Sequence, residues 1–265
     1  MTPGESRLSP RMYGDADGYE AYMGGWSSLL APLFLRFALA EKPEELLDLG
    51  CGTGNLLVAA RKMFPGVALT GVDPSAALLE RALAHPRLAD ANFTKGAAEA
   101  LPFRPASFNA VLSLLVLQEF PEPQRALAEM RRVARRGGPV AACQWDFAKM
   151  PVIAALVDAL VEVAPAGALR LRSSPVFASE DELRQAWLRA GFAEVTVRRL
   201  AVTRCYANFA ALWGPLLSGP TPSTLTLARL GSTDREAVRA AVRRRLGADE
   251  PLMIRAEAFA VRGVA

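Results

Sequence analysis

The chain has 265 residues, of which 51% are hydrophobic and 22% charged, a composition typical of a folded globular protein. This length is sufficient for one large domain with a substantial core. The net charge is +4, but the arginines behind it are dispersed or fall late in predicted helices, where cations favour the helix dipole, so we expect no nucleic-acid partner.

No apolar run reaches the length that crosses a bilayer, and the N-terminus lacks the basic and apolar segments of a secretory signal. The odd number of cysteines argues against a disulfide framework, and their spacing is not that of metal ligands. We therefore expect a cytoplasmic protein with no membrane partner and no metal, in which Cys51, Cys143 and Cys205 are free, buried thiols.

Residues 1–43 form an aromatic and helical N-terminal segment. Residues 13–28 hold three tyrosines and a tryptophan among polar residues, a composition unlike that of a plain core. An amphipathic helix is expected over residues 29–40, with Pro32 in its first turn, where proline is tolerated.

The rest of the chain is organised around residues 45–55. A short apolar strand ends at Asp48 and runs into three glycines at alternate positions, and a helix is predicted over residues 54–63. Glycine permits a sharp turn with positive φ and lets a ligand approach where a Cβ would block it. Because position 55 is Asn, the spacing differs from the Gly-x-Gly-x-x-Gly of dinucleotide binders, which favours another ligand.

A second buried strand, residues 67–72, leads to Asp73, about 20 positions past the glycine turn, where an α/β sheet places the acceptor for a ribose diol. A helix over residues 75–84 follows, with His85 in its last turn. Strands then alternate with helices, which predicts a doubly wound, mostly parallel sheet with its ligand at the carboxyl ends of the strands. These later elements are strands at 91–94, 108–114 and 138–145 and a helix at 123–135.

The pattern changes after residue 146, where an apolar stripe at helical spacing indicates an insertion and not a plain crossover. We expect one domain, with a cofactor-binding core over residues 44–146 and helical cap insertions at 147–178 and 203–250. The remaining predicted elements are helices at 179–190, 207–218 and 234–246, a Ser/Thr/Pro-rich loop at 218–226, and strands at 193–202 and 254–261.

Four stretches resemble class I S-adenosylmethionine-dependent methyltransferases. Leu-Asp-Leu-Gly-Cys-Gly-Thr-Gly at residues 47–54, Asp73, residues 96–103 and residues 107–113 look like motif I, the ribose acid, the adenine loop and the fourth strand. The resemblance covers about residues 44–146. It implies a seven-stranded Rossmann-like sheet with an antiparallel last strand, S-adenosylmethionine as the cofactor and a small-molecule methyl acceptor. Such transfer depends mainly on the alignment of nucleophile, methyl group and leaving sulfur.

The resemblance also implies which residues bind the cofactor. Gly50, Cys51 and Gly52 would pass beside its methionine part, with Asp48 near the ammonium, and Asp73 would bind both ribose hydroxyls. The adenosine would be bordered by Pro74, Ala98 and Glu99 and, on its other side, by Leu114 and Leu115. Tyr22 and Trp26 would line the pocket from a segment that folds over the cofactor, although they could equally be packing contacts on the outside of the domain.

Two departures from the family pattern matter. Many relatives have Asp where this chain has Ala97, so cofactor affinity is expected to be weaker unless Glu99 takes over the contact with the adenine amino group. Relatives also commonly show histidine at the position of Gln118, which cannot act as a base. Glu119, Asp146 and Tyr22 could do so, but none is assigned as catalytic.

Two alternatives therefore stay open. A protein that binds S-adenosylmethionine or S-adenosylhomocysteine without transferring a methyl group would explain Ala97 and the missing base. An NAD-dependent oxidoreductase is disfavoured by Asn55, which breaks the dinucleotide spacing.

Overall fold

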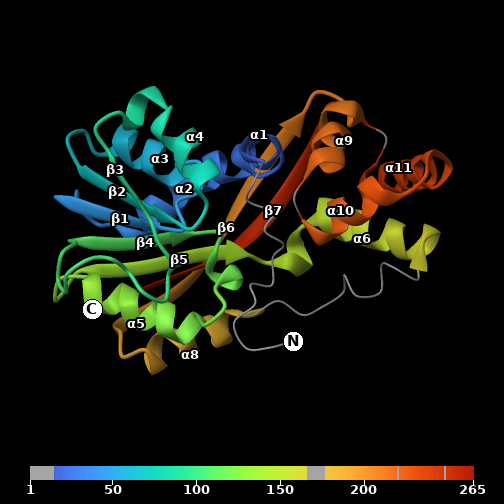
Figure 1. Cartoon of the computed structure of the whole chain (residues 1–265). Helices are drawn as coiled ribbons and strands as arrows, with labels where there is room; N and C mark the ends of the chain where they lie inside the picture. The colour runs from blue at the N-terminus through green and yellow to red at the C-terminus, as the bar shows by residue number, and fades with distance from the viewer. Residues whose placement is uncertain (1–14, 166–176, 220, 248) are drawn as a thin grey trace.

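The computed structural model describes residues 15–165, 177–219, 221–247 and 249–265 (Figure 1). Seven strands form one sheet in the order β3-β2-β1-β4-β5-β7-β6. β1 to β5 are parallel, while β7 runs antiparallel to both β5 and β6, so the predicted doubly wound, mostly parallel sheet is confirmed. The strands are β1 (Glu45–Leu49), β2 (Ala68–Asp73), β3 (Asn92–Lys95), β4 (Ala110–Leu114), β5 (Pro139–Trp145), β6 (Ala193–Tyr206) and β7 (Leu252–Val264).

Helices cover both faces of the sheet, which explains why its central strands are apolar runs without alternation. Leu46, Leu47 and Leu49 of β1 are all fully buried although they point to opposite faces. In Figure 1, α2, α3 and α4 lie above the sheet and α5 and α8 below it. These helices are α2 (Gly25–Ala38), α3 (Asn55–Met63), α4 (Ala76–Leu83), α5 (Pro123–Val133) and α8 (Glu180–Arg189).

Four further helices, called the outer helices below, lie beyond the carboxyl ends of the parallel strands (Figure 1). They are α6 (Pro151–Val163), α9 (Phe209–Ser218), α10 (Pro222–Arg229) and α11 (Ser232–Leu246). α11 packs along α6, and α10 packs against both α9 and α6. β6 and β7 reach this group because their pairing continues past the end of β5, from Ala201 opposite Glu257 to Tyr206 opposite Leu252.

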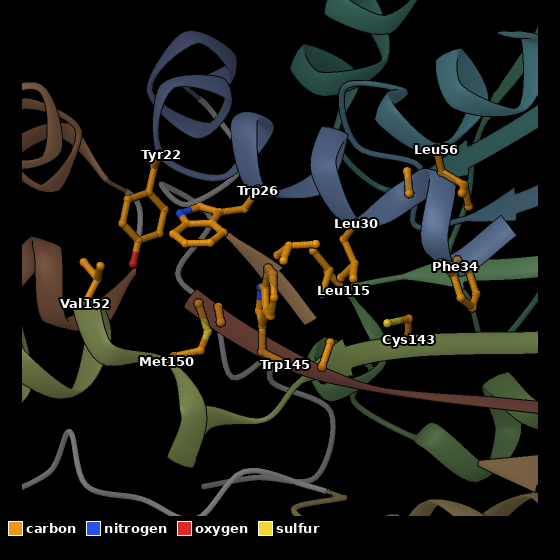
Figure 2. Packing of buried hydrophobic residues seen from close by; sticks show 14 of the residues in the cluster. Tyr22, Trp26, Leu30, Phe34, Leu56, Leu115, Cys143, Trp145, Met150 and Val152 are labelled. Carbon is orange, nitrogen blue, oxygen red and sulfur yellow. The ribbon is translucent and has the colours of Figure 1, made fainter. Parts of the chain in front are cut away.

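Two aromatic residues of the N-terminal segment, Tyr22 and Trp26, belong to the hydrophobic core, which corrects the expectation for these two. Tyr19 is partly exposed, and Tyr13 lies outside the described residues. Short helix α1 (Ala16–Tyr19) continues through a π-helical turn, η2 (Glu20–Gly24), into α2. Tyr22 and Trp26 are only 6% and 4% exposed. Trp26 packs edge-on against Trp145, with ring centroids 5.9 Å apart and an interplanar angle of 82° (Figure 2).

Local capping explains two other differences from the predicted elements. α10 occupies most of the expected loop at 218–226, because Thr221 caps it by accepting from the Thr224 N–H and Pro222 fills its first position. His85 does not lie in the last turn of α4; it precedes the 3₁₀ turn η3 (Pro86–Leu88) and accepts from the Arg87 N–H.

Two smaller expectations were also wrong. α2 begins at Gly25, so Pro32 lies inside the helix and not in its first turn. Cys51 and Cys143 are buried, but Cys205 lies near the end of β6 and is exposed.

Within the described ranges, no helix is long and apolar enough to cross a membrane. The same ranges hold no group of three or more His, Cys, Asp and Glu side chains that could bind a metal ion.

Candidate functional site

The turn between β1 and α3 depends on glycine. Gly50, Gly52 and Gly54 have φ values of +71°, +52° and +85°, a region that residues with a Cβ adopt at a cost. The N–H groups of Gly50 and Cys51 both donate to the Val72 carbonyl, at 2.8 and 3.0 Å, which ties the turn to β2. A Cβ at Gly50 would lie 2.5 Å from Cγ1 of Val116, so the turn also needs glycine for space.

Two carboxylates lie buried beside this turn. Asp73 Oδ2 accepts from the Gly52 N–H and Oδ1 from the Ser75 N–H, both at 2.9 Å, and each oxygen keeps a lone pair for a further donor. Burial raises the pKa of Asp73, and these two N–H groups oppose that rise. Burial, and then the charge of Asp73, raise the pKa of Asp48 well above its ordinary value.

Asp48 Oδ1 has no hydrogen-bond partner within the described part of the chain. A buried carboxylate without a partner is costly, so it is stable only when protonated or when a cation or another donor lies beside it. The arrangement therefore suits a positively charged group next to Asp48.

The N-terminal segment is fastened to the glycine turn by Glu20. Its Oε2 accepts from Thr53 Oγ1 at 2.6 Å and from Asn55 Nδ2 at 3.1 Å, and Asn55 Oδ1 accepts from Ser28 Oγ at 2.7 Å. Asn55, which breaks the dinucleotide spacing, thus links the turn to η2 and α2. Tyr19 lines two of the hollows described below. Burial, and then the charge of Asp73, raise the pKa of its phenol, so the hydroxyl stays protonated and can donate a hydrogen bond.

A cavity of about 190 Å³, called the sheet-end cavity, opens beside Asp73. Pro74, Ala98 and Glu99, which the resemblance places beside the adenosine, all line this cavity. Glu99 Oε1 accepts from the Glu122 N–H at 3.3 Å. The segment after β4 also lines the cavity, through Val116, Glu119, Phe120 and Pro121.

Leu114 and Leu115, which the resemblance places on the other side of the adenosine, do not line the sheet-end cavity. Leu114 borders a hollow of about 20 Å³ near Asp48 and Cys51, and Leu115 borders a different cavity. The chain turns at Leu115, which has a φ of +64° and donates its N–H to the Cys143 carbonyl at 2.6 Å. This turn carries the next residue, Val116, to the wall where the leucines were expected.

The second cavity, of about 110 Å³, is called the aromatic cavity. It reaches from Gly50, Gly52 and Asp73 to the outer helices. Tyr22 lines it, whereas Trp26 stands behind Trp145 and borders a smaller apolar hollow. Its other walls come from Tyr19, Met23, Leu78, Leu115, Val116, Gln118, Glu119, Trp145, Phe147, Met150, Ile153 and Thr221.

Several of these lining residues were missed in the sequence because they come from distant segments. Tyr19 was part of the aromatic segment but carried no distinguishing pattern. Ile153 belonged to the predicted apolar helical stripe, which does not reveal that one end of the helix faces a cavity, and Met150, just before the helix, was not singled out. A Thr-Pro pair, at Thr221 and Pro222, could have revealed the start of α10.

The possible bases differ in their surroundings. Glu119 ends the 3₁₀ turn η4 (Leu117–Glu119) and lines both cavities. Asp146 instead caps η5 (Phe147–Lys149) and pairs with Arg199 at 3.1 Å. Burial raises the pKa of Tyr22 to about 12, so its hydroxyl stays protonated near neutral pH and is not available as a base.

Comparisons with known proteins agree with this arrangement. A family model described as a methyltransferase domain matches residues 47–142. A demethylmenaquinone methyltransferase of Roseiflexus castenholzii is 31% identical over 207 residues, covering 69% of this chain and 84% of the relative. A malonyl-[acyl-carrier protein] O-methyltransferase of Geobacter sulfurreducens is 32% identical over 186 residues, covering 69% of this chain and 68% of the relative. Against some other curated relatives, among them a demethylmenaquinone methyltransferase of Thermotoga maritima, the match spans only 42% or 43% of their length.

A solved structure supports the same relationship. A candidate type II methyltransferase of Anaeromyxobacter dehalogenans superimposes with a TM-score of 0.62 at 26% identity, covering 88% of this chain and 95% of that one. The chain belongs to the class I S-adenosylmethionine-dependent methyltransferases.

Proposed function

We propose that the protein transfers the methyl group of S-adenosylmethionine to a small, uncharged, ring-containing acceptor held in the aromatic cavity. The observation that carries this proposal is the pair of adjoining cavities that share Gly50 and Asp73. One cavity suits the nucleoside, and the other lies between the glycine turn and the outer helices, which would act as a cap over the acceptor.

The residues beside the glycine turn fit this cofactor. The unpartnered Asp48 Oδ1 suits the ammonium of its methionine part, and the backbone at Gly50 and Gly52 leaves room for a close approach. The free lone pairs of Asp73 suit the two ribose hydroxyls. Ala98 and Phe120, which both line the sheet-end cavity, would border the adenine.

S-adenosylmethionine, when bound, supplies a methyl group that is electrophilic because it is attached to a sulfonium sulfur. The chain's own contribution is mainly orientation and the exclusion of water. Trp145, Met150 and Ile153 surround the acceptor with apolar side chains, and Tyr22 and Thr221 close the far wall. Where the acceptor group carries a proton, Glu119 is placed between the two cavities to accept it.

The acceptor class follows from the lining of the aromatic cavity. Among its described lining residues there is no Lys, Arg or His, while Asp73 and Glu119 carry carboxylates. An anionic acceptor would be repelled there. The named relatives act on demethylmenaquinone and on malonyl-[acyl-carrier protein], and an uncharged ring resembles the first of these more than the second.

Turnover with methyl-labelled S-adenosylmethionine and a panel of uncharged hydroxylated and amino-substituted ring compounds tests the proposal. We expect label to move to at least one acceptor. Met150→Trp, which fills the aromatic cavity, should abolish that transfer while leaving the affinity for S-adenosylhomocysteine within about twofold. Transfer that persists in Met150→Trp would place the acceptor elsewhere.

The non-enzyme alternative is separated in the same experiment. A protein that only binds the cofactor would bind S-adenosylhomocysteine in calorimetry but transfer no label to any member of the panel. Binding of NAD without binding of S-adenosylhomocysteine would contradict the proposed cofactor itself.

A further inference from the structure

A small hollow adjoins the aromatic cavity beside α9 and is called the α9 hollow. Its volume is about 20 Å³. Four residues line both spaces, so the two meet along these side chains: Tyr22, Met23, Met150 and Ile153. Its remaining walls come from Trp26, Val152, Tyr206, Leu212, Pro215 and Leu216.

The walls of the α9 hollow are mostly apolar. Among its described lining residues there is no Asp, Glu, Lys, Arg or His. Leu212, Pro215 and Leu216 face it from one side of α9, because residues three and four apart lie on the same face of a helix. A buried water needs several polar partners, which such walls do not provide. The lining therefore favours an apolar group of a bound molecule.

The boundary between the two spaces is within reach of a ligand and can move. Met23 and Ile153 are only half-buried, so they keep surface that a ligand can contact. Met23 and Met150 have unbranched, flexible side chains that adapt to irregular spaces. Figure 2 shows Met150 close to Tyr22, Trp26 and Val152 at this boundary. A substituent can therefore pass between the methionines from one space into the other.

The α9 hollow lies at the end of the aromatic cavity away from the glycine turn. Gly50, Gly52 and Asp73 line the aromatic cavity but not the α9 hollow. The shared residues belong instead to η2 and to the start of α6. A molecule that occupies both spaces thus has one end in the α9 hollow and the other end towards the proposed cofactor site.

The two volumes limit the size of each part. An engineered apolar cavity of about 150 Å³ in another protein binds benzene, and the aromatic cavity, at about 110 Å³, is of the same order. A single water-sized group needs about 10–15 Å³. The α9 hollow, at about 20 Å³, therefore has room for roughly one or two carbon atoms.

We propose that the acceptor ring carries a short alkyl group at the end opposite the atom that receives the methyl group, and that this alkyl group binds in the α9 hollow. The hollow selects its length, and by holding this end it aims the reactive end at the glycine turn. This inference rests on the proposed function, since it takes the aromatic cavity as the acceptor site.

A series of phenols tests both the length and the position of the alkyl group. The probes are phenol, 4-methylphenol, 4-ethylphenol, 4-butylphenol and the isomer 2-ethylphenol. Their dissociation constants are measured by ligand-observed NMR with saturating S-adenosylhomocysteine, at neutral pH, where the phenols are protonated. The proteins are the wild type, Leu216→Phe, which narrows the α9 hollow, and Leu216→Ala, which widens it.

Two further variants serve as controls. Leu227→Ala removes an equally large side chain from α10, where Leu227 is fully buried but lines neither space. Met150→Trp fills the boundary and should abolish binding of every probe. Thermal unfolding confirms that each variant is folded. Should Leu216→Phe not fold, Val152→Leu narrows the same hollow by a smaller amount and takes its place.

We expect the wild type to bind 4-ethylphenol about 10-fold more tightly than phenol, because each buried carbon contributes about fourfold. 2-Ethylphenol and 4-butylphenol should show no such further gain. Leu216→Phe should reduce the advantage of 4-ethylphenol to less than about twofold while leaving phenol itself within about twofold. Leu216→Ala should make 4-butylphenol the tightest probe, and Leu227→Ala should leave the wild-type order unchanged.

An affinity that rises with alkyl length equally in the wild type and both Leu216 variants would overturn the inference, as would equal binding of the two ethylphenols. The same holds for probe binding that survives Met150→Trp. Failure of the wild type to bind S-adenosylhomocysteine, or to bind any probe beside it, would contradict the proposed function as well. Phenol binding beside the cofactor without the expected dependence on Leu216 would contradict this inference alone.

Discussion

The sheet-end cavity and the aromatic cavity lie at the same edge of the sheet but are built in different ways. The first is formed by short runs at the ends of neighbouring strands, with backbone groups and buried carboxylates such as Asp73 close to the ligand space. The second is assembled from η2, η4, the end of β5, α6 and the start of α10, and its walls are mostly apolar side chains. On the proposed assignment, the cofactor site thus depends on backbone geometry, and the acceptor site on long-range packing.

This difference predicts different responses to substitution. Changes near the glycine turn should affect cofactor binding strongly, because no other group can take over the role of its backbone conformation and fixed hydrogen bonds. Changes in the aromatic cavity should alter which acceptor binds while leaving the cofactor bound. The predictions below test the first half of that contrast, in order of decreasing effect.

Gly50→Ala should have the largest effect. Its Cβ would require a φ of +71° and would lie 2.5 Å from Val116 Cγ1, so either the turn or Val116 must move. Both residues line both cavities. We expect the affinity for S-adenosylhomocysteine to fall by more than about 100-fold in calorimetry, which is roughly 3 kcal/mol.

Gly137→Ala is the matched control for this change. Gly137 has a φ of +79°, but a Cβ there would have no atom within 4 Å. It should cost about 1 kcal/mol of stability from backbone strain and leave cofactor affinity unchanged. Equal effects of the two substitutions on binding would show that Gly50 matters only through general stability.

Asp73→Ala should weaken S-adenosylhomocysteine by about 1.5–3 kcal/mol, the range for hydrogen bonds to a charged group. This corresponds to roughly a 10- to 100-fold rise in the dissociation constant. Asp90→Ala, which removes an exposed carboxylate paired with Arg61, should change nothing. An unchanged dissociation constant in folded Asp73→Ala would remove Asp73 from the ribose site.

Without ligand, Asp48→Asn should be more stable than the wild type, by a margin that increases as pH rises. Because burial raises the pKa of Asp48 in the folded state, ionisation is easier in the unfolded state and destabilises the fold at high pH. That penalty is relieved as pH falls through the raised pKa towards the ordinary value of 3.8, below which both states are protonated. The gain in Tm over the wild type should therefore grow with pH, while cofactor affinity falls.

A Tm difference that stays constant across the pH series would show that Asp48 is not a strained carboxylate. Asp90→Asn, at an exposed position, serves as the control and should show little change in Tm at any pH.

Ala97→Asp should have the smallest effect. Ala97 lines the sheet-end cavity, and an added acceptor there should strengthen cofactor binding by about 1 kcal/mol, less the cost of desolvating Asp. If Glu99 already accepts from the adenine, the second carboxylate is repelled and gains nothing. Ala97→Asp combined with Glu99→Ala separates these cases, because Asp should then rescue binding. No shift in either variant would mean that this loop does not face adenine.

Most of the fold and of the sheet-end cavity could be predicted from the sequence because their determinants are local. An apolar run that ends at Asp48 and is followed by alternate glycines permits few backbone conformations. The apolar strand before Asp73 likewise ends in a carboxylate at the edge of the sheet. The paths of Leu114 and Leu115 could not be predicted, since they depend on the positive φ at Leu115 and its bond to Cys143.

The aromatic cavity could be predicted only in outline. The ligand was expected at the carboxyl ends of the strands, where β5 ends at Trp145. The residues that line the cavity together with Trp145, such as Tyr22, Met150 and Thr221, come from three distant segments. An apolar side chain gives the same pattern whether it faces a core or a cavity. Their common position follows from the packing of the outer helices, which no local pattern encodes.

The most direct test of the two-cavity account is a crystal structure with S-adenosylhomocysteine bound. The account predicts that both ribose hydroxyls donate to Asp73, that the adenine lies between Ala98 and Phe120, and that the space beside Trp145 and Met150 stays open for an acceptor. A nucleoside that fills the aromatic cavity, or a ribose with no contact to Asp73, would contradict it.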